Sequence, residues 1–208
     1  MLIVGLTGGV ASGKTTVSKV FEEEGAYLID TDQIARELVQ PCSPAYHEII
    51  KVFGKEILEE DGTLHRKRLA SRIFSDPDQR RSLNRILHPR IKEEMDRRIK
   101  GISKRAPEMI VVVDAPLLVE TGIHRKMDKV VVITSREDQQ IKRLRAREGL
   151  SPEEARKIIS SQMALEEKVK IADFVIQNEG SLGEAIRQTR KVFQELKKTA
   201  QQKKGPKQ

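Results

Sequence analysis

The sequence predicts an α/β fold, in which helices flank a parallel sheet of five strands. Short apolar runs of strand length recur along the chain without polar alternation, as expected for strands that are buried on both faces. Helical patterns separate these runs, and this alternation favours a parallel sheet with right-handed crossovers. The expected strands are Leu2–Leu6, Tyr27–Ile29, Ile110–Val113, Val130–Ile133 and Phe174–Ile176.

One connection between these strands is too long to be a simple crossover. Between Asp30 and Ile110, about eighty residues show helical periodicity and no convincing strand, whereas a crossover needs only about a dozen. We therefore predict an inserted helical lobe. Within it, helices are expected to start at Ser43-Pro44 and Asp76-Pro77, turns to form at Phe53-Gly54 and Asp61-Gly62, and two helices to be separated at His88-Pro89.

The chain from Arg136 to Lys168 is a basic helical stretch interrupted at Glu148-Gly149-Leu150. Such a hairpin could serve as a lid. Ser151 and Ser181 are each followed three residues later by a glutamate, which predicts capping boxes at two helix starts. The last helix is expected to bury Leu182, Ile186, Val192, Phe193 and Leu196.

Together, these elements predict a single domain over residues 1–208. Its core is expected at about 1–40, 105–136 and 169–198, the helical lobe at about 41–104 and the lid at about 137–168. The Lys- and Gln-rich end, about 199–208, is expected to be a disordered basic tail.

The composition excludes several classes of protein. No apolar run is long enough to span a bilayer, and the first residues lack the positive segment of a secretory signal. Cys42 is the one cysteine, so it cannot form an intramolecular disulfide. A single thiol fits a reducing compartment, and we expect a cytoplasmic protein without membrane contact.

The formal net charge of +8 favours an anionic ligand. Five of the lysines follow the last acidic residue, Glu195. With two tyrosines and no tryptophan, the chain has few aromatic platforms on which nucleic-acid bases could stack. The charge therefore fits a compact ligand such as a nucleotide at least as well as a nucleic acid.

The first strand leads directly into Gly8-Gly9-Val10-Ala11-Ser12-Gly13-Lys14-Thr15, which fits the pattern G-x-x-x-x-G-K-[ST]. A strand before the motif and a helix after it are the context that a phosphate-binding P-loop requires. Glycines let the loop turn its N–H groups inward, and the helix N-terminus adds partial positive charge. Lys14 supplies a full charge, and Thr15 can offer its hydroxyl to magnesium. The alternative, a glycine-rich turn with an exposed lysine, fits the spacing and flanks poorly.

Other motifs decide what kind of P-loop protein this is. The N-K-x-D base reader and the D-x-x-G motif of GTPases are missing, and so is the signature of transporter ATPases. A small-molecule kinase remains. Such an enzyme needs a group that positions the acceptor hydroxyl, cations that neutralise the transferring phosphoryl group, and an element that excludes water.

Asp30 and Asp32, at the carboxyl end of the second strand, are candidates for positioning the acceptor, because ligands of open α/β sheets gather there. Residues two apart at a strand end project to opposite sides, so one acid is expected to serve the chemistry and the other the structure. Spacing alone does not choose between them. Capping of the helix over Gln33 to Val39 is the alternative role, and we expect it for at least one of the two.

The candidate cations are Arg143 and Arg147, which share one helix face. They could reach the phosphate site, or they could belong to a solvated basic face, since other basic residues lie nearby. Asp114, after the third strand, occupies the position of a Walker-B acid and could act on magnesium through water. Helix capping is an equal alternative for Asp114.

The ordered set of motifs resembles the dephospho-coenzyme A kinases over nearly the whole chain. The segments that carry the resemblance are Gly5-Leu6-Thr7-Gly8-Gly9, Ser12-Gly13-Lys14-Thr15-Thr16, Asp30-Thr31-Asp32, Ile34-Ala35-Arg36-Glu37, Phe53-Gly54, Asp61-Gly62-Thr63-Leu64, Arg66, Leu83-Asn84, His88-Pro89, Pro116-Leu117-Leu118, Glu120, Arg143, Arg147, Gln162, Ala172-Asp173 and Asn178-Glu179-Gly180. Each segment is a weak signal, but their order is specific. Ala11 stands where the family often has glycine, and Thr31 where it often has alanine.

The resemblance implies a P-loop three-layer fold with a helical substrate lobe and a helical lid. It implies that Asp32, rather than Asp30, lies near the acceptor hydroxyl and that Lys14, Arg143 and Arg147 act on the phosphoryl group. The implied nucleotide-binding residues are Gly8, Gly9, Ala11, Ser12, Gly13, Lys14, Thr15, Thr16, Asn178 and Gly180, with Thr15 on the metal. The implied acceptor-binding residues are Asp32, Arg66, His88, Pro116, Leu117 and Leu118.

The expected function is therefore the ATP- and Mg²⁺-dependent phosphorylation of the ribose 3′-hydroxyl of dephospho-CoA, which gives CoA and ADP. We expect a monomer or weak homo-oligomer whose partner is the small-molecule substrate, with no nucleic acid. One alternative is a kinase of another nucleoside or nucleotide. A second, of a different class, is a nucleotide-dependent protein that binds nucleic acid through its lobe and basic tail.

Overall fold

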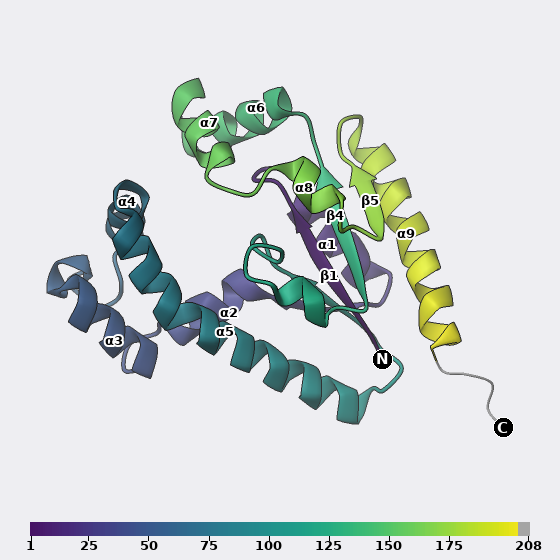
Figure 1. Cartoon of the computed structure of the whole chain (residues 1–208), viewed down its shortest axis with the longest axis horizontal. Coiled ribbons are helices and arrows are strands. Elements are labelled where there is room, and N and C mark those ends of the chain that lie inside the picture. Colours follow the sequence, from purple (N-terminus) through teal and green to yellow (C-terminus); the bar gives the residue numbers. More distant parts are fainter. Residues whose placement is uncertain (204–208) are drawn as a thin grey trace. The chain divides into compact units, whose positions relative to one another are not determined.

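The computed structural model describes residues 1–203 of the 208. Its centre is a five-stranded parallel sheet in the order β2-β3-β1-β4-β5 (Figure 1). The strands are β1 (Leu2–Gly8), β2 (Tyr27–Asp30), β3 (Ile110–Asp114), β4 (Lys129–Thr134) and β5 (Phe174–Gln177). All five predicted strands, and with them the fold class, are confirmed.

The sheet is buried on both faces in the way that its sequence pattern predicts. β1 pairs in parallel with β3 on one side and β4 on the other, with Leu6 opposite Asp114 and Val131. Every residue of β3 is buried. Helices α1 (Lys14–Glu23) and α9 (Leu182–Gln202) pack on each other and against β1 and β3. Phe21 of α1 and Phe193 of α9 meet there, with ring centroids 5.7 Å apart.

The chain forms two compact units. The first contains Met1–Ile29 and the chain from Gly101 onward, with the sheet at its centre. The second, the helical unit, is Asp30–Lys100, and its own core includes Ile49, Phe53 and Ile86. The helical unit starts before the predicted start of the lobe, about residue 41, because α2 (Thr31–Leu38) already belongs to it.

The helical unit contains α2, α3 (Pro44–Phe53), a 3₁₀ turn at Lys55–Ile57, α4 (Arg66–Ser75) and most of α5 (Pro77–Arg105). Its predicted start signals are confirmed, because Ser43 caps α3 and Asp76 accepts hydrogen bonds from the first amides of α5. The turn at Gly54 is also confirmed, since its φ of 80° lies in the region that favours glycine.

The predicted helix break at His88-Pro89 is wrong. Helix α5 continues through Pro89. A proline inside a helix removes one backbone hydrogen bond and disturbs the preceding turn, but burial of Ile86 and Met95 holds both halves of this helix in place. The Arg90 guanidinium also donates to the Ile86 carbonyl at 2.6 Å, next to the Arg85 carbonyl whose backbone donor the proline removes. Tertiary packing has thus outweighed the local signal.

The predicted basic hairpin consists of α6 (Glu137–Glu148) and α7 (Pro152–Ser160), which pack side by side, followed by the short α8 (Leu165–Val169) (Figure 1). Both predicted capping boxes are present, at Ser151 and Ser181. In the described part of the chain, no helix has the length and apolar character needed to cross a membrane.

Two expectations for the C-terminal helix are wrong. Leu182 is 62% exposed, because it is the first helical residue and lies outside the packed stripe that ends in Phe193 and Leu196. Helix α9 continues to Gln202, so the disordered tail does not start at 199. Ala200 packs against the core, and Lys203 pairs with Asp128. The rest of the predicted tail, 204–208, lies outside the described residues.

Candidate active site

The phosphate-binding motif forms a tight loop between β1 and α1. Ser12 N donates to the Gly9 carbonyl at 3.1 Å, and Gly13, with a φ of 93°, leads into the first turn of α1. Ala11 also has a positive φ, 54°, at the position where we noted that the family often has glycine. The loop thus has the P-loop conformation although one of its left-handed positions carries a side chain.

The loop glycines are required by close neighbours as well as by backbone angles. A Cβ on Gly8 would lie 2.7 Å from the Ile133 carbonyl oxygen, and one on Gly13 would lie 2.1 Å from the Asn178 amide nitrogen. That same amide donates to the Ser12 carbonyl at 2.8 Å. The segment after β5 therefore lies directly against the phosphate-binding loop.

Replacing Gly13 with alanine is expected to weaken ATP binding at least about tenfold and to lower the free energy of unfolding by about 1–2 kcal/mol. A left-handed backbone costs an L-residue about that much, and the new methyl group must displace Asn178 from the loop. The control is Gly25→Ala, because Gly25 has a similar φ of 100° but nothing near its absent Cβ. Nucleotide titration and urea unfolding separate the two effects: both variants lose stability, and only Gly13→Ala loses nucleotide. Equal ATP affinity in the two variants would contradict the role of this contact.

Lys14, the first residue of α1, points its ammonium group at Asp114 at the end of β3, and the two form an ion pair. Ser18, one turn further along α1, donates to the other carboxylate oxygen of Asp114 at 2.5 Å. The acid is 4% exposed. Asp114 thus pairs with the P-loop lysine, a role that sequence reasoning did not consider beside magnesium binding and capping.

Arg143 of α6 joins the site, as predicted. Its guanidinium donates to the carbonyl of Ala11 at 3.2 Å and to that of Asn178 at 3.1 Å. Both acceptors are neutral, so these contacts leave its positive charge available beside the loop. Arg147, one turn further on, instead pairs with Glu148 and is 62% exposed. The structure therefore brings one of the two predicted arginines to the loop.

The turn that follows β3 carries Pro116, Leu117 and Leu118. The Pro116 carbonyl accepts from the Thr7 hydroxyl at 3.1 Å, which ties the turn to the end of β1. Leu118 is fully buried against Gly5, where a Cβ would come within 2.6 Å of it. Leu117 is 36% exposed. Of the two predicted leucine contacts, only that of Leu117 is open to a ligand.

The helical unit carries the other three predicted acceptor residues. Asp30 caps α2, because its carboxylate accepts from the backbone amides of Asp32 and Gln33 at 2.8 and 3.1 Å. Asp32 is exposed in the first turn of α2, not on a strand, so the argument from alternating strand sides is wrong. The capping role expected for at least one of the acids is confirmed for Asp30. Arg66 is the exposed first residue of α4.

His88 lies on α5 and is half-buried. Burial lowers its pKa from the usual value, which keeps the imidazole neutral at neutral pH. A neutral imidazole both donates and accepts hydrogen bonds, and this suits a polar but uncharged part of a ligand.

A family model for dephospho-CoA kinases matches residues 2–184 of this sequence. The chain belongs to the dephospho-CoA kinase family. A dephospho-CoA kinase of Bacillus thuringiensis is 47% identical over 181 residues, 87% of this chain and 90% of that protein. Among solved structures, a dephospho-CoA kinase from Campylobacter jejuni has a TM-score of 0.71 at 28% identity, covering 95% of this chain and 98% of its own. A Thermus thermophilus protein has a TM-score of 0.78 at 31% identity, covering 94% and 97%.

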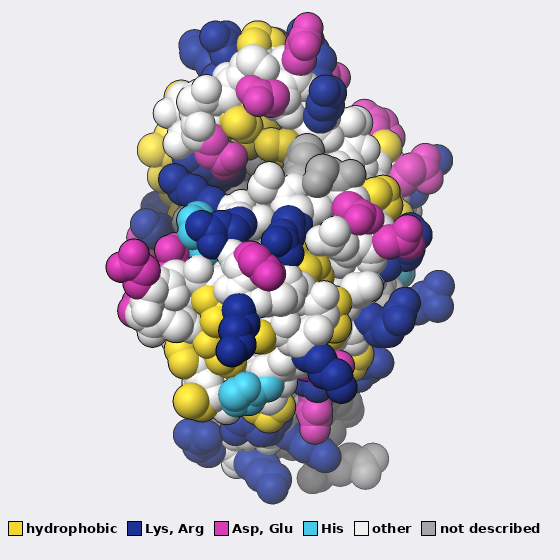
Figure 2. Space-filling model, turned by 90° about the vertical axis from the view of Figure 1, so that its left-hand side faces the viewer, with side chains coloured by type: hydrophobic (Ala, Val, Ile, Leu, Met, Phe, Trp, Pro, Cys, Tyr) yellow, Lys and Arg dark blue, Asp and Glu magenta, His cyan; other side chains and the backbone are white. Residues whose placement is uncertain are grey.

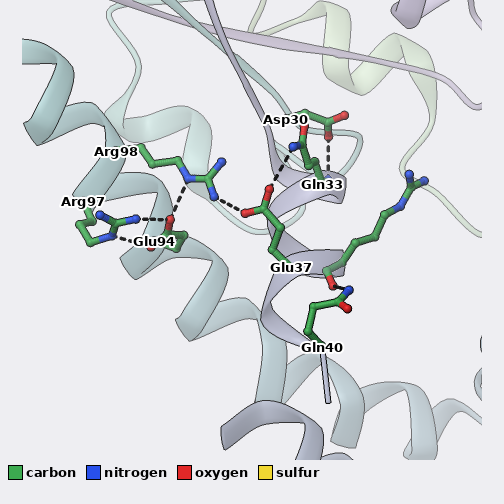
Figure 3. Close-up of polar contacts among 8 residues, drawn as sticks. Asp30, Gln33, Glu37, Gln40, Glu94, Arg97 and Arg98 are labelled. Atoms are coloured by element: carbon green, nitrogen blue, oxygen red, sulfur yellow. Dashed lines mark hydrogen bonds and ion pairs between the residues drawn. The ribbon is translucent and has the colours of Figure 1, made fainter. Parts of the chain in front are cut away.

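In this kinase, an ion-pair network anchors α2, the helix that carries Asp32 (Figure 3). Glu37, near the end of α2, accepts from Gln33 on its own helix at 3.0 Å and pairs with Arg98 of α5. Arg98 also donates to Glu94 at 2.8 Å, and Arg97 holds both oxygens of Glu94 at 2.6 Å. Two basic groups therefore face one carboxylate.

Hydrogen bonds from Arg97 and then from Arg98 lower the pKa of Glu94 to about 2 from an ordinary 4.5. The ionised carboxylate therefore stabilises the fold fully above about pH 4.5, and this contribution is lost as the pH falls towards 2.

Glu94→Gln is expected to be less stable than the parent at pH 7, with the difference shrinking between pH 4.5 and 2. Urea unfolding across this range measures the difference. Glu93→Gln, an exposed neighbour on α5, is the control and should show no such pH-dependent gap; a gap that stays constant down to pH 2 would contradict the assignment.

Sequence reasoning missed several residues of this kinase's site. Gln140 of α6 touches the loop, since a Cβ on Gly9 would lie 2.7 Å from its amide nitrogen. Ser18 and Lys168 contact Asp114 and Pro116 respectively. No pattern singles out one serine, glutamine or lysine of a helix, because such contacts join residues remote in sequence.

Proposed function

We propose that this protein transfers the γ-phosphoryl group of Mg·ATP to the ribose 3′-hydroxyl of dephospho-CoA and so forms CoA and ADP. The observation that carries this proposal is the P-loop, with Lys14 in the helix that follows it. Arg143 is hydrogen-bonded both to Ala11 of this loop and to Asn178. Membership of the dephospho-CoA kinase family supports the choice of acceptor. It favours this function over both alternatives, the kinase of another nucleotide and the nucleic-acid-binding protein.

In this proposal, the loop amides and the N-terminus of α1 bind the ATP phosphates. The Lys14 ammonium leaves Asp114 to contact the β- and γ-phosphates when nucleotide binds. Arg143 neutralises charge on the transferring group, and Arg147 joins it from the lid after releasing Glu148. Asn178 and Gly180 border the adenine. Charge neutralisation is the main contribution of a protein to phosphoryl transfer, because the transition state spreads charge over the phosphoryl oxygens.

The oxygen donors beside the loop fit Mg²⁺. Thr15 is exposed in the first turn of α1. Asp114 is the last residue of β3, the strand that pairs with β1. The described residues contain no cluster of three His, Cys, Asp or Glu side chains able to hold a metal alone. This agrees with an ion held partly by substrate phosphates, as Mg²⁺ usually is. When bound, the ion would polarise the phosphate oxygens; Thr15 would hold it directly and Asp114 through water.

For the acceptor, we propose that Asp32 aligns the ribose 3′-hydroxyl. The contacts of Arg66, His88 and the Pro116–Leu118 turn would hold the rest of dephospho-CoA. A loose transition state asks for little proton removal early in the transfer. Orientation is therefore the main contribution of Asp32.

The face shown in Figure 2 gives no support to the nucleic-acid alternative. On the face shown in Figure 2, Lys and Arg side chains are scattered among acidic and apolar ones, whereas nucleic-acid binding typically uses a continuous basic stripe. Cys42 is exposed and free, which fits action in the reducing cytoplasm. We further propose that the protein acts as a monomer or weak homo-oligomer.

A comparison of acceptors tests the proposed function. With Mg·ATP fixed, the rates with dephospho-CoA, AMP, adenosine and shikimate are compared, and the product of the best acceptor is digested to locate the new phosphate. We expect a kcat/KM for dephospho-CoA at least about a hundredfold above the others, since buried polar groups left unpaired penalise the wrong acceptor. A preference for another acceptor, or phosphate at another hydroxyl, would overturn the assignment.

A further inference from the structure

Lys168 is a fully buried lysine that the proposed mechanism does not use. It lies on α8, at the end of the lid, and its side chain is 0% exposed. Lysine is rarely buried completely, because an ammonium group loses its hydration there. An apolar side chain of similar length would fill the same space without this penalty. The charge therefore needs a reason beyond packing.

The contacts of Lys168 indicate that reason. Its ammonium donates to the Pro116 carbonyl at 2.9 Å and pairs with Glu120 at 2.8 Å. The Pro116 carbonyl also accepts from Thr7, at the end of β1. The same Glu120 oxygen accepts from the Met163 amide, in the segment that leads from α7 to α8. Lys168 and Glu120 thus join the turn after β3 to α8 and to the segment between α7 and α8, which together form the base of the lid.

These bonds fix the orientation of one peptide group. The Pro116 carbonyl is held inward by two donors, while Leu118 is packed on Gly5. Leu117, between them, is the exposed residue of the turn. Without Lys168, the Thr7 hydroxyl would be the remaining donor to the Pro116 carbonyl among these contacts, so this peptide group could rotate and shift Leu117, the next residue.

We propose that Lys168 is a positioning residue for the acceptor: together with Glu120, it fixes the Pro116–Leu118 turn to the base of the lid, so that dephospho-CoA meets a preformed surface. The inference rests on the proposed contact between this turn and dephospho-CoA. Because the contacts of Lys168 are with Pro116 and Glu120 and not with the phosphate-binding loop, its loss should affect the acceptor and spare ATP.

The test is the variant Lys168→Met, measured for both substrates. We expect the KM for dephospho-CoA to rise about tenfold or more, with the KM for ATP within about twofold, because misplacing a substrate contact by about an ångström can cost up to a hundredfold. The matched control is Lys170→Met. Lys170 lies on the same α8–β5 stretch and pairs with Glu167 in solvent, so its loss should change neither KM.

Lys168→Met leaves Glu120 without its ammonium, and this lowers stability by itself. The double variant Lys168→Met/Glu120→Gln removes the unpaired charge, so thermal stability should recover while the KM for dephospho-CoA stays high. Recovery of the KM together with stability would overturn the positioning role. Leu117→Ala separates this failure from that of the proposed function. If Leu117→Ala raises the KM for dephospho-CoA and the double variant does not, only the positioning role fails; if neither raises it, the proposed acceptor contact fails as well.

Discussion

Replacing Asp32 with asparagine is expected to lower kcat for CoA formation by about 10³-fold while changing the dissociation constant of ATP less than about threefold. Asparagine keeps the size of the side chain but removes the charge that orients the acceptor hydroxyl and takes up its proton. General-base and positioning contributions of this kind are worth about 10² to 10⁴ in rate. ATP affinity should be retained, because the loop, Lys14 and Asn178 are unchanged. Steady-state kinetics with both substrates and nucleotide titration measure the two quantities.

The control is Asp30→Asn, two residues earlier. Asp30 accepts from the amides of Asp32 and Gln33 as the cap of α2, and asparagine caps helices as well as aspartate does. This variant should therefore keep its stability and most of its kcat. Equal losses in the two variants would show that Asp32 acts through the structure of α2 rather than on the acceptor.

Replacing Arg143 with methionine is expected to lower kcat by about 10³-fold or more. An arginine placed on the transferring phosphoryl group contributes about 10³ to 10⁵ in rate. Arg143 is the lid arginine that already reaches the loop, through the Ala11 and Asn178 carbonyls. Its loss removes both the charge and the hydrogen bonds from α6 to the loop and to the segment after β5. Single-turnover transfer with saturating substrates measures the chemical step directly.

Arg145→Met is the control for charge, since Arg145 lies on the same helix and is exposed. It should leave kcat within about twofold. Arg147→Met should lose less than Arg143→Met if Arg147 contributes only after it leaves Glu148. A loss in Arg145→Met as large as that in Arg143→Met would show that general basicity of the lid, rather than the placement of Arg143, drives the rate.

The fold was predictable wherever one local signal decided it. The five strands follow from buried apolar runs, and the helix starts at Ser43, Ser151 and Ser181 follow from capping residues. The errors arose where packing opposed a local signal. Pro89 lies inside α5 because Ile86 and Met95, on either side of it, are both buried, and α9 continues to Gln202 because Ala200 packs against the sheet unit.

The site was predictable as far as it is contiguous in the sequence. The P-loop is one segment, and its glycines, lysine and helix start follow from the motif. The partners of that segment do not. Asp114 is a hundred residues from Lys14, and Lys168 is fifty-two from Pro116. A pattern of residue types gives no information about such pairings, so the ion pair at Lys14 and the buried ammonium of Lys168 emerged only from the structure.

The most direct test of the central claim is CoA formation from Mg·ATP and dephospho-CoA by the purified protein, with folded Asp32→Asn measured in parallel. The account predicts rapid CoA formation by the parent, one ADP for each CoA, and nearly none by the variant. A parent protein that binds or hydrolyses ATP but forms no CoA would contradict the assignment of the acceptor, although the phosphate-binding loop would stand.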